Sequence, residues 1–260
     1  MRRSLLFIPS NNPAMLQNAD VFGSDSVIFD LEDAVNVTEK DNARNLLYYY
    51  LLEHQDLNME VVVRINGLDT PYFEDDLEKI VSDNIDCIML PKARIEDVKK
   101  LDSLLTKLEL KKQLKKQIKI LPIIELAISV LEVERTKQGK EIEYARSRVA
   151  YACKAYQIDA IDTPFTDVND NEGLKADCIN CKELGLNAKA AIHPNQIDII
   201  NDSFLPSLKL IKWAQRVMIA TEEANKKGIG AFSLDGKMVD KPVIERALKI
   251  IKKAERFNVL

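Results

Sequence analysis

The sequence predicts an α/β fold, a TIM (β/α)8 barrel that is followed by a C-terminal helical extension. Short apolar runs rich in β-branched residues alternate with amphipathic segments, and this alternation indicates parallel strands joined by helices. Nearly every run ends in polar residues, as in barrels, whose sites are built from the carboxyl ends of many strands. The segment SNNPAM after the first run contains no glycine, which argues against the glycine-rich phosphate loop of a nucleotide-binding Rossmann fold.

The predicted strands follow one another along the chain, separated by predicted helices and loops. They are SLLFIP (4–9), SVIFDLED (26–33), EVVVRING (60–67), CIMLPKAR (87–94), IKILPIIE (118–125), DAIDTPF (159–165) and AKAAIHP (188–194). The clearest helix between them is TEKDNARNLLYYYLLEH (38–54), with Thr38 as its expected N-cap. We divide the chain into a barrel over residues 1–205 and a helical extension over residues 206–260.

The strand count falls one short of the eight strands of a barrel. Between Glu125 and Asp159 the sequence predicts helices but no buried strand. A barrel that lacks one strand exposes two parallel edges, whereas parallel sheets are normally covered. Either the fold is unusual, or one βα unit, the sixth in the order of a complete barrel, is absent from these 260 residues.

The composition excludes several classes of protein. The 260 residues are 46% hydrophobic and carry a formal net charge of −4, so the lysine-rich run at 109–119 is interpreted as a solvated helix face and not as a nucleic-acid site. The four cysteines form no disulfide-rich pattern. No apolar run suits a signal peptide or approaches the ~18 residues of a membrane span. We therefore expect a reduced, cytoplasmic protein that binds neither nucleic acid nor membrane.

Eight motifs, in order over essentially the whole chain, resemble the HpcH/HpaI aldolase family, which includes citrate lyase β subunits and citramalyl- and malyl-CoA lyases. They are RRSLLFIPSNNPAML, VIFDLEDAVNVTEKDNAR, VRINGLDT, MLPKAR, LPIIE, AIDTPFTDVNDNEGL, AIHPNQI and SLDGKMVDKPVIERA. The resemblance implies a TIM barrel with a C-terminal extension, a bound Mg2+ and cleavage of a 3-hydroxy thioester. The segments VTEKDNAR and KMVDKPVIERA favour the citrate lyase β branch.

Within that branch the implied reaction cleaves a citryl thioester, citryl-ACP or citryl-CoA, to oxaloacetate and an acetyl thioester. The implied partners are the α subunit and the acyl carrier protein γ subunit of a citrate lyase, and the chain is expected to form a homo-oligomer, a trimer or a hexamer. Two alternatives stay open. One is a stand-alone citramalyl- or malyl-CoA lyase, and the other is a non-catalytic barrel that serves only as an assembly subunit.

The chain departs from the family pattern at several positions. Ser10 stands where a glycine is usual, Asn12 where an arginine is frequent, and Leu126 where a small residue is usual. The largest departure lies near residue 132. There the family has a strand with a Gly-Ala-Glu-Asp-like motif, whose aspartate is the second metal ligand, but here Glu132-Val133 continues directly into ERT.

The resemblance assigns roles to three residues at predicted strand ends. Arg64 would hold a substrate carboxylate through two parallel hydrogen bonds and so serve both binding and catalysis, although a salt bridge at the rim is the plain alternative. Gly67 would let a backbone N–H approach the ligand closely. Glu125 would bind Mg2+, which typically takes only one or two protein carboxylates, although its position suits a buried ion pair equally well. The second ligand, an aspartate, is not present in the sequence.

Four further strand-end residues carry polar groups. Asp30 and Glu32 lie two apart and point the same way, so they hold metal-bound waters, position Arg64 or belong to a structural network. Lys92 could form a Schiff base, but a thioester enolate lacks the ketone that this needs, so we expect it to contact substrate. His193 is one of only two histidines, which excludes a zinc site with several histidine ligands, and it is interpreted as structural.

Asp240 precedes the last predicted helix in SLDGKMVDKPV. The plain interpretation is an N-cap, because aspartate caps well and proline is tolerated just inside a helix. The resemblance implies a second role, in which the extension covers a neighbouring subunit's site and Asp240 takes part in acid–base chemistry. Both roles can hold at once.

Overall fold

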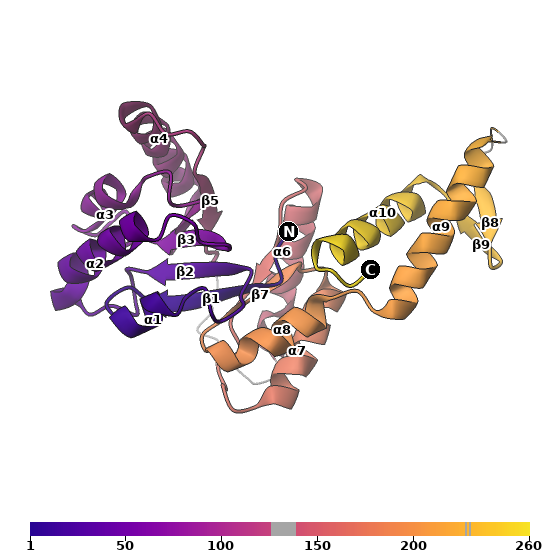
Figure 1. Ribbon diagram of the computed structural model, residues 1–260, viewed down its shortest axis with the longest axis horizontal. Coiled ribbons are helices and arrows are strands. Elements are labelled where there is room, and N and C mark those ends of the chain that lie inside the picture. The colour runs from indigo at the N-terminus through magenta and orange to yellow at the C-terminus, as the bar shows by residue number, and fades with distance from the viewer. Residues whose placement is uncertain (126–138, 227, 229) are drawn as a thin grey trace. The chain divides into compact units, whose positions relative to one another are not determined.

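The computed structural model describes residues 1–125, 139–226, 228 and 230–260 (Figure 1). These residues form two compact units. The first unit comprises Arg2–Ser203, and the second comprises Phe204–Leu260 together with Met1. No helix in the described part of the chain is long and apolar enough to cross a membrane.

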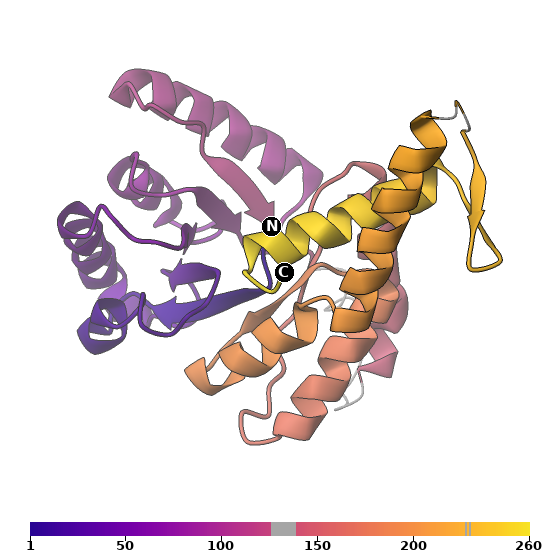
Figure 2. The ribbon, with the colours of Figure 1, turned by 45° about the vertical axis from the view of Figure 1, so that its right-hand side comes forward.

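The first unit is an α/β fold built on a parallel sheet. Its described strands are β1 (Ser4–Pro9), β2 (Ser26–Asp30), β3 (Glu60–Arg64), β4 (Cys87–Leu90), β5 (Lys119–Pro122), β6 (Ile161–Asp162) and β7 (Ala188–Ala191). They run in the order β5-β4-β3-β2-β1-β7-β6, and every pairing is parallel. All seven predicted strands are therefore confirmed. Strand β1, the first in the chain, pairs with both β2 and β7, as strands do in a sheet that curls like part of a barrel (Figure 2).

The described sheet has two parallel edges, at β5 and β6. Strands β2, β4 and β7 are buried throughout, whereas Lys119 and Pro122 of β5 are exposed and its two central residues only half-buried. Ile124, just beyond β5, is 56% exposed. The junction that the sequence places near residue 132 lies outside the described residues.

Helices connect these strands. They are α1 (Pro13–Gln17), α2 (Lys40–Glu53), α3 (Phe73–Ile80), α4 (Ile95–Lys112), α6 (Glu143–Ala155), α7 (Asn171–Leu184) and α8 (Ile197–Phe204), with short 3-10 turns η1 (Val37–Glu39), η2 (Lys140–Ile142) and η3 (Pro194–Gln196). Figures 1 and 2 show α2, α3 and α4 along one side of strands β1 to β5. The expected N-cap at Thr38 is wrong. The Asn36 side chain accepts the Thr38 N–H instead, so η1 precedes α2.

Alternation along the strands sorts the side chains onto two faces. Leu5, Ile28 and Val62 form one core cluster with residues of β4 and β7. Asp30 lies two residues after Ile28, and Arg64 lies two residues after Val62. Both charged residues therefore stand on the same face as this apolar cluster, at the carboxyl ends of their strands.

A polar cluster lies at the opposite, amino end of this face. Arg2 forms a two-pronged ion pair with Glu60, and Ser26 Oγ donates to Glu60 Oε2 at 2.7 Å. Arg2 Nη1 also lies 3.1 Å from Asp159 Oδ2. Burial alone would raise the pKa of Glu60, but the hydrogen bonds from Arg2 and Ser26 outweigh it, and the pKa lies below its ordinary value. This cluster ties β1, β2 and β3 together below the apolar core.

The second unit packs α9 (Leu208–Lys226) against α10 (Lys241–Arg256) and a hairpin of β8 (Phe232–Leu234) and β9 (Lys237–Val239). Asp235 and Gly236 join the two strands with φ of 52° and 75°. Tight two-residue hairpins need positive φ at both central positions, and Asp-Gly supplies it. The DG of SLDGKMV is therefore explained by a turn.

Candidate active site

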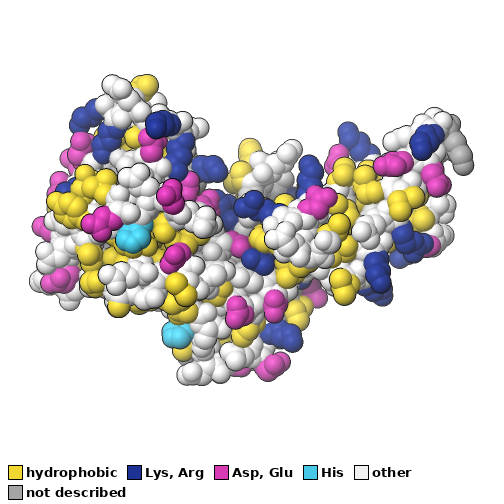
Figure 3. Space-filling view, in the orientation of Figure 1, with side chains coloured by type: hydrophobic (Ala, Val, Ile, Leu, Met, Phe, Trp, Pro, Cys, Tyr) yellow, Lys and Arg dark blue, Asp and Glu magenta, His cyan; other side chains and the backbone are white. Residues whose placement is uncertain are grey.

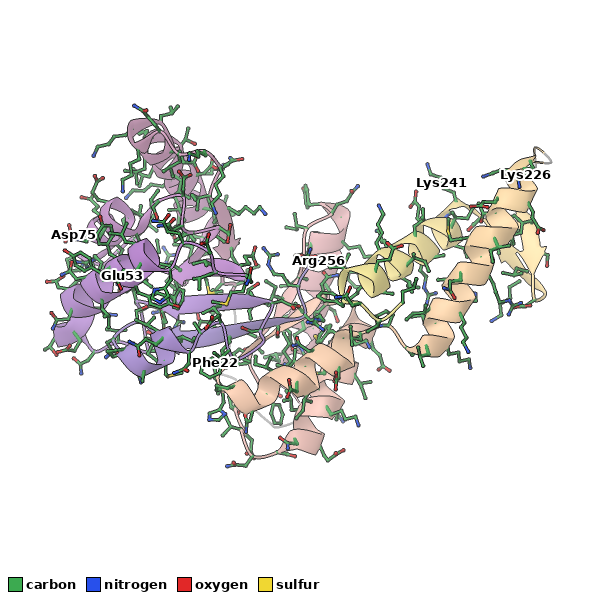
Figure 4. All side chains as sticks on the ribbon, in the orientation of Figure 1. Phe22, Glu53, Asp75, Lys226, Lys241 and Arg256 are labelled. Carbon is green, nitrogen blue, oxygen red and sulfur yellow. The ribbon has the colours of Figure 1, made fainter. Side chains whose placement is uncertain are left out.

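Five predicted site residues form one continuous charged network in the first unit. It runs from Asp30 to Arg64, Glu32, Lys92 and Glu125. These residues lie at the ends of β2 and β3 or just after β2, β4 and β5, and the carboxyl ends of these strands meet because the strands are parallel. Figure 4 draws the described side chains as sticks on the ribbon.

Asp30 fixes the orientation of Arg64. Arg64 Nε donates to Asp30 Oδ1 at 2.7 Å and Nη2 donates to Oδ2 at 2.5 Å, in a two-pronged pair. The guanidinium also lies over the ring of Phe7, 4.9 Å from its centroid. Asp30 is fully buried, and it accepts the backbone N–H groups of Glu32 and Ala34 at 2.9 and 3.1 Å. One carboxylate therefore both shapes the loop after β2 and positions the arginine.

Glu32 joins the two cations of the network. Its Oε1 accepts from Lys92 Nζ at 2.8 Å, and its Oε2 lies 3.1 Å from Arg64 Nη1. That second contact lacks hydrogen-bond geometry, so the buried Oε2 has no hydrogen-bond donor among the described residues. Burial raises the pKa of Glu32 above its ordinary value, against the hydrogen bond from Lys92 and the charge of Arg64. The site thus contains a carboxylate oxygen with unused capacity to accept.

Lys92 links Glu32 to Glu125. Its backbone is left-handed, with φ of 49°, and its N–H donates to Glu125 Oε1 at 2.7 Å. The hydrogen bond to Glu32 raises the pKa of Lys92 above its ordinary value. A Schiff base needs a neutral amine, which requires a lowered pKa. The structure therefore weighs against the rival lysine chemistry.

Gly67 lies in the loop after β3, where its carbonyl accepts from the N–H and the hydroxyl of Thr70 at 3.0 and 2.7 Å. A Cβ added there would come within 2.7 Å of Asp69 Oδ1. The approach of a ligand to the Gly67 N–H stays a prediction.

Besides Gly67, two further residues that the sequence singled out, Asp240 and His193, lie outside the network. Asp240 belongs to the second unit, where it caps α10 by accepting the Val243 N–H at 3.3 Å; Figure 4 labels the next residue, Lys241. The N-cap interpretation is thus confirmed, and the acid–base role stays a prediction. His193 caps η3, and its Nδ1 lies 2.8 Å from Asn195 Oδ1, which agrees with a structural role.

The residues that hold the site's loops were not predicted from the sequence. Lys40 and Arg44 on α2 and Asp76 on α3 are all buried. A usable signal was present, because two cations four residues apart on an amphipathic helix share one face. The departure residue Ser10 also lies close by, since its N–H donates to the Asp30 carbonyl at 3.0 Å.

The described residues contain no group of three or more Asp, Glu, His or Cys side chains arranged to hold a metal. Mg2+ keeps several waters, however, and typically takes only one or two carboxylates. The carboxylates of Glu125 and Glu32 are hard oxygen donors of this kind, and Oε2 of Glu32, which accepts no hydrogen bond from the described residues, lies 3.1 Å from Arg64 Nη1. Three carboxylates and two cations also leave the network with a formal charge of −1, so a divalent cation would suit it.

The fold and the network define a class of protein, an α/β enzyme whose charged site lies at the carboxyl ends of parallel strands. The chain belongs to the HpcH/HpaI aldolase/citrate lyase family, whose profile matches residues 3–136 and 128–194. The family predicted from the motifs is therefore confirmed.

Three relatives place the chain within this family. The citrate lyase subunit beta of Leuconostoc mesenteroides subsp. cremoris is 37% identical over 290 aligned positions, which cover 100% of this chain and 95% of the relative. An L-malyl-CoA/beta-methylmalyl-CoA lyase of Rhodobacter capsulatus is 30% identical, with 100% and 96% covered. The crystal structure of CitE from Mycobacterium tuberculosis, in complex with magnesium, acetoacetate and coenzyme A, superposes with a TM-score of 0.72 at 27% identity, over 98% of each chain.

Proposed function

We propose that this protein is a Mg2+-dependent lyase that cleaves a citryl thioester to oxaloacetate and an acetyl thioester, as the β subunit of a citrate lyase. The observation that carries the proposal is the network from Asp30 to Glu125, found in a chain that matches a citrate lyase β subunit over its full length. We further propose the acyl carrier protein γ subunit and the α subunit as partners, a homo-oligomeric assembly, and a cytoplasmic location.

The reaction sets clear demands on the site. The bond that breaks joins the carbinol carbon of the citryl group to the CH2 beside the thioester carbonyl. A base removes the carbinol proton, the C–O bond becomes the ketone of oxaloacetate, and the electron pair of the broken bond moves onto the thioester as an enolate. An acid then protonates the CH2 carbon, which becomes the methyl group of the acetyl thioester.

Arg64 is suited to orient a substrate carboxylate. Asp30 engages two of the five N–H donors of the guanidinium, and it holds the group rigid over Phe7. A fixed guanidinium loses little further freedom when a ligand binds. Lys92, half-exposed and charged, is placed to contact a second carboxylate.

Mg2+ fits this site and would be held by Glu125, with Glu32 or the aspartate of the family motif as its second carboxylate. When bound it would polarise the carbinol oxygen. Adding +2 to a network of formal charge −1 also turns a site that would repel a polycarboxylate into one that attracts it. Asp240, carried by the extension of a neighbouring subunit, is our candidate for the acid–base step.

The closed form of the fold is part of this proposal. We infer that a complete TIM barrel would place an eighth strand between β5 and β6, the two edges of the described sheet. Two alignments support a missing βα unit. The 290 aligned positions of the Leuconostoc relative exceed this chain's 260 residues by 30, and the two family matches overlap over residues 128–136. The second metal ligand would enter with that unit.

The test measures oxaloacetate release from citryl-CoA with Mg2+ and with a chelator. We expect release that depends on Mg2+. A folded protein that shows no such release would be an assembly subunit only, contrary to the proposal. The similarity to the Rhodobacter relative supports a second candidate function, that of a malyl-CoA lyase. Faster release of glyoxylate from malyl-CoA than of oxaloacetate from citryl-CoA would favour that function.

A further inference from the structure

We propose that Lys40 and Arg44 of α2 are positioning residues, which hold the two loops that carry the charged network of the active site. The inference deepens the proposed lyase function and rests on it for its kinetic part. Its structural part stands on contacts within the first unit alone.

Lys40 holds the loop after β2. Its side chain is buried, and Nζ donates to the backbone carbonyls of Leu31 and Glu32 at 2.7 and 2.6 Å. Burying an ammonium is costly unless it is hydrogen-bonded. Here the bonded groups are backbone carbonyls directly after Asp30, and one of them belongs to Glu32 itself. Lys40 therefore fixes the segment from which Glu32 reaches Lys92 and Arg64.

Arg44 holds the loop after β3, one helical turn further along the same face of α2. Its Nε donates to Asp76 Oδ1 at 2.7 Å. The other oxygen of Asp76 accepts both the backbone N–H and the side-chain amide of Asn66, at 2.9 and 2.7 Å. Asp76 is fully buried. The Arg44–Asp76 pair therefore anchors the backbone two residues after Arg64.

These two contacts connect one rigid helix to both sides of the Asp30–Arg64 pair. Strand β2 is tied to α2 through Lys40, and strand β3 through Arg44 and Asp76. Asp30 and Arg64 then join the same two strands from the opposite face. A loop displacement of about 1 Å can lower a rate by about 100-fold. The loss of either contact should therefore shift residues of the network and lower the rate.

The placement of the contacts argues against a role in folding alone. A cation that served only stability would be expected in an ion pair, yet Lys40 donates to carbonyls of active-site residues. Arg44 acts on the site only through Asp76, since Nη1 binds Asp41 and Nη2 has no hydrogen-bond partner in the described part of the chain.

The first test is kinetic. We expect Lys40→Met and Asp76→Asn each to lower kcat for citryl-CoA cleavage by about tenfold to 100-fold, with KM changed by less than about threefold. Lys40→Arg, which keeps a cation and donors, should recover part of the loss. The matched control is Lys107→Met on the exposed side of α4, which should leave kcat unchanged. Circular dichroism confirms that each variant is folded.

The second test is hydrogen exchange, which needs no substrate. Lys40→Met should speed exchange in residues 31–35 and leave residues 65–70 protected. Asp76→Asn should do the reverse, because the amide has a single acceptor oxygen and cannot accept from both Arg44 and Asn66. Unchanged exchange, or changed exchange with unchanged kcat, overturns the inference. If the parent chain cleaves no citryl-CoA, the proposed function fails, and the exchange pattern alone then decides whether the two loops are held as proposed.

Discussion

The Asp30–Arg64 pair is the best-defined contact of the candidate site, and it explains why an arginine is needed there. Two parallel hydrogen bonds hold the guanidinium, and Phe7 supports it from one side. A lysine offers a single point charge and cannot make this two-pronged contact. The geometry of this residue therefore matters as much as its charge.

The first prediction concerns Arg64→Lys. We expect kcat/KM for citryl-CoA to fall by about 100-fold or more, a loss of about 3 kcal/mol in transition-state stabilisation. The fold should persist, because the positive charge opposite Asp30 remains. Steady-state kinetics with Arg148→Lys, a control on the exposed side of α6, make the comparison. Equal rates for Arg64→Lys and the parent would remove Arg64 from the mechanism.

The second prediction concerns the pH dependence of stability at Glu60, at the amino end of the sheet. Its pKa is lowered in the fold, so it stabilises the native state above its unfolded pKa, and this contribution is lost as the pH falls through its folded value. Glu60→Gln should lower the free energy of unfolding by about 1–3 kcal/mol at pH 7. The difference in the free energy of unfolding between this variant and the parent should shrink as the pH falls below about 4.5, the ordinary pKa of a glutamate.

Urea unfolding at a series of pH values, without added metal, measures this difference. Glu53→Gln at the exposed end of α2 provides the control and should run parallel to the parent at every pH. A gap between parent and Glu60→Gln that stayed constant down to pH 3 would show that the ion pair with Arg2 does not titrate as inferred.

At the scale of elements, the start of α10 bears on two roles that the sequence left open for Asp240, helix capping and acid–base chemistry. The aspartate accepts the Val243 N–H, and Pro242 follows within the first turn. Asparagine caps a helix about as well as aspartate, whereas alanine does not. The two substitutions therefore divide capping from acid–base chemistry.

The third prediction follows from that division. Asp240→Asn should leave the thermal midpoint nearly unchanged but lower kcat, because an amide cannot exchange a proton at this step. Asp240→Ala should lower kcat and also destabilise the protein by about 0.5–2 kcal/mol. Calorimetry and single-turnover kinetics on both variants decide the matter. If Asp240→Asn cleaved the thioester at the rate of the parent, Asp240 would act only as a helix cap.

The elements were predictable where the signal is local. Buried parallel strands appear as short apolar runs, and all seven predicted strands were found. Local competition misled the prediction at Thr38, because Asn36 two residues earlier supplies the cap. The spacing of Lys40 and Arg44 on one helix face was a readable signal. The burial of Lys40 and Asp76 was not, because it depends on carbonyl and amide groups that only the tertiary fold brings near.

At the scale of the whole molecule, charge and sheet topology bear on function together. The face in Figure 3 shows Lys and Arg side chains interspersed with Asp and Glu, as expected for a formal net charge of −4. The sheet topology is less ordinary, because a closed barrel has no open edge. Strands β5 and β6 both lack a second neighbour among the described residues.

The last prediction tests that open side. We expect the 260-residue chain to bind a hydrophobic dye and to self-associate, because β5 is poorly covered and Ile124 beside it is exposed. Inserting the corresponding segment of the Leuconostoc relative near residue 132 should raise the thermal midpoint, lower dye binding and increase the Mg2+-dependent rate. The gain in rate should come from the aspartate ligand that the family motif is expected to supply with this segment.

A glycine–serine insert of equal length is the control, since it lengthens the loop without supplying a strand or a carboxylate. A third variant carries the relative's segment with that aspartate changed to asparagine. It should keep the gain in stability and lose the gain in rate, because covering the edges and binding the metal are separate contributions. The relative's segment and the glycine–serine insert could instead behave alike. The open side of the sheet would then belong to the native structure of this protein, and Glu125 and its present neighbours would have to form the complete metal site.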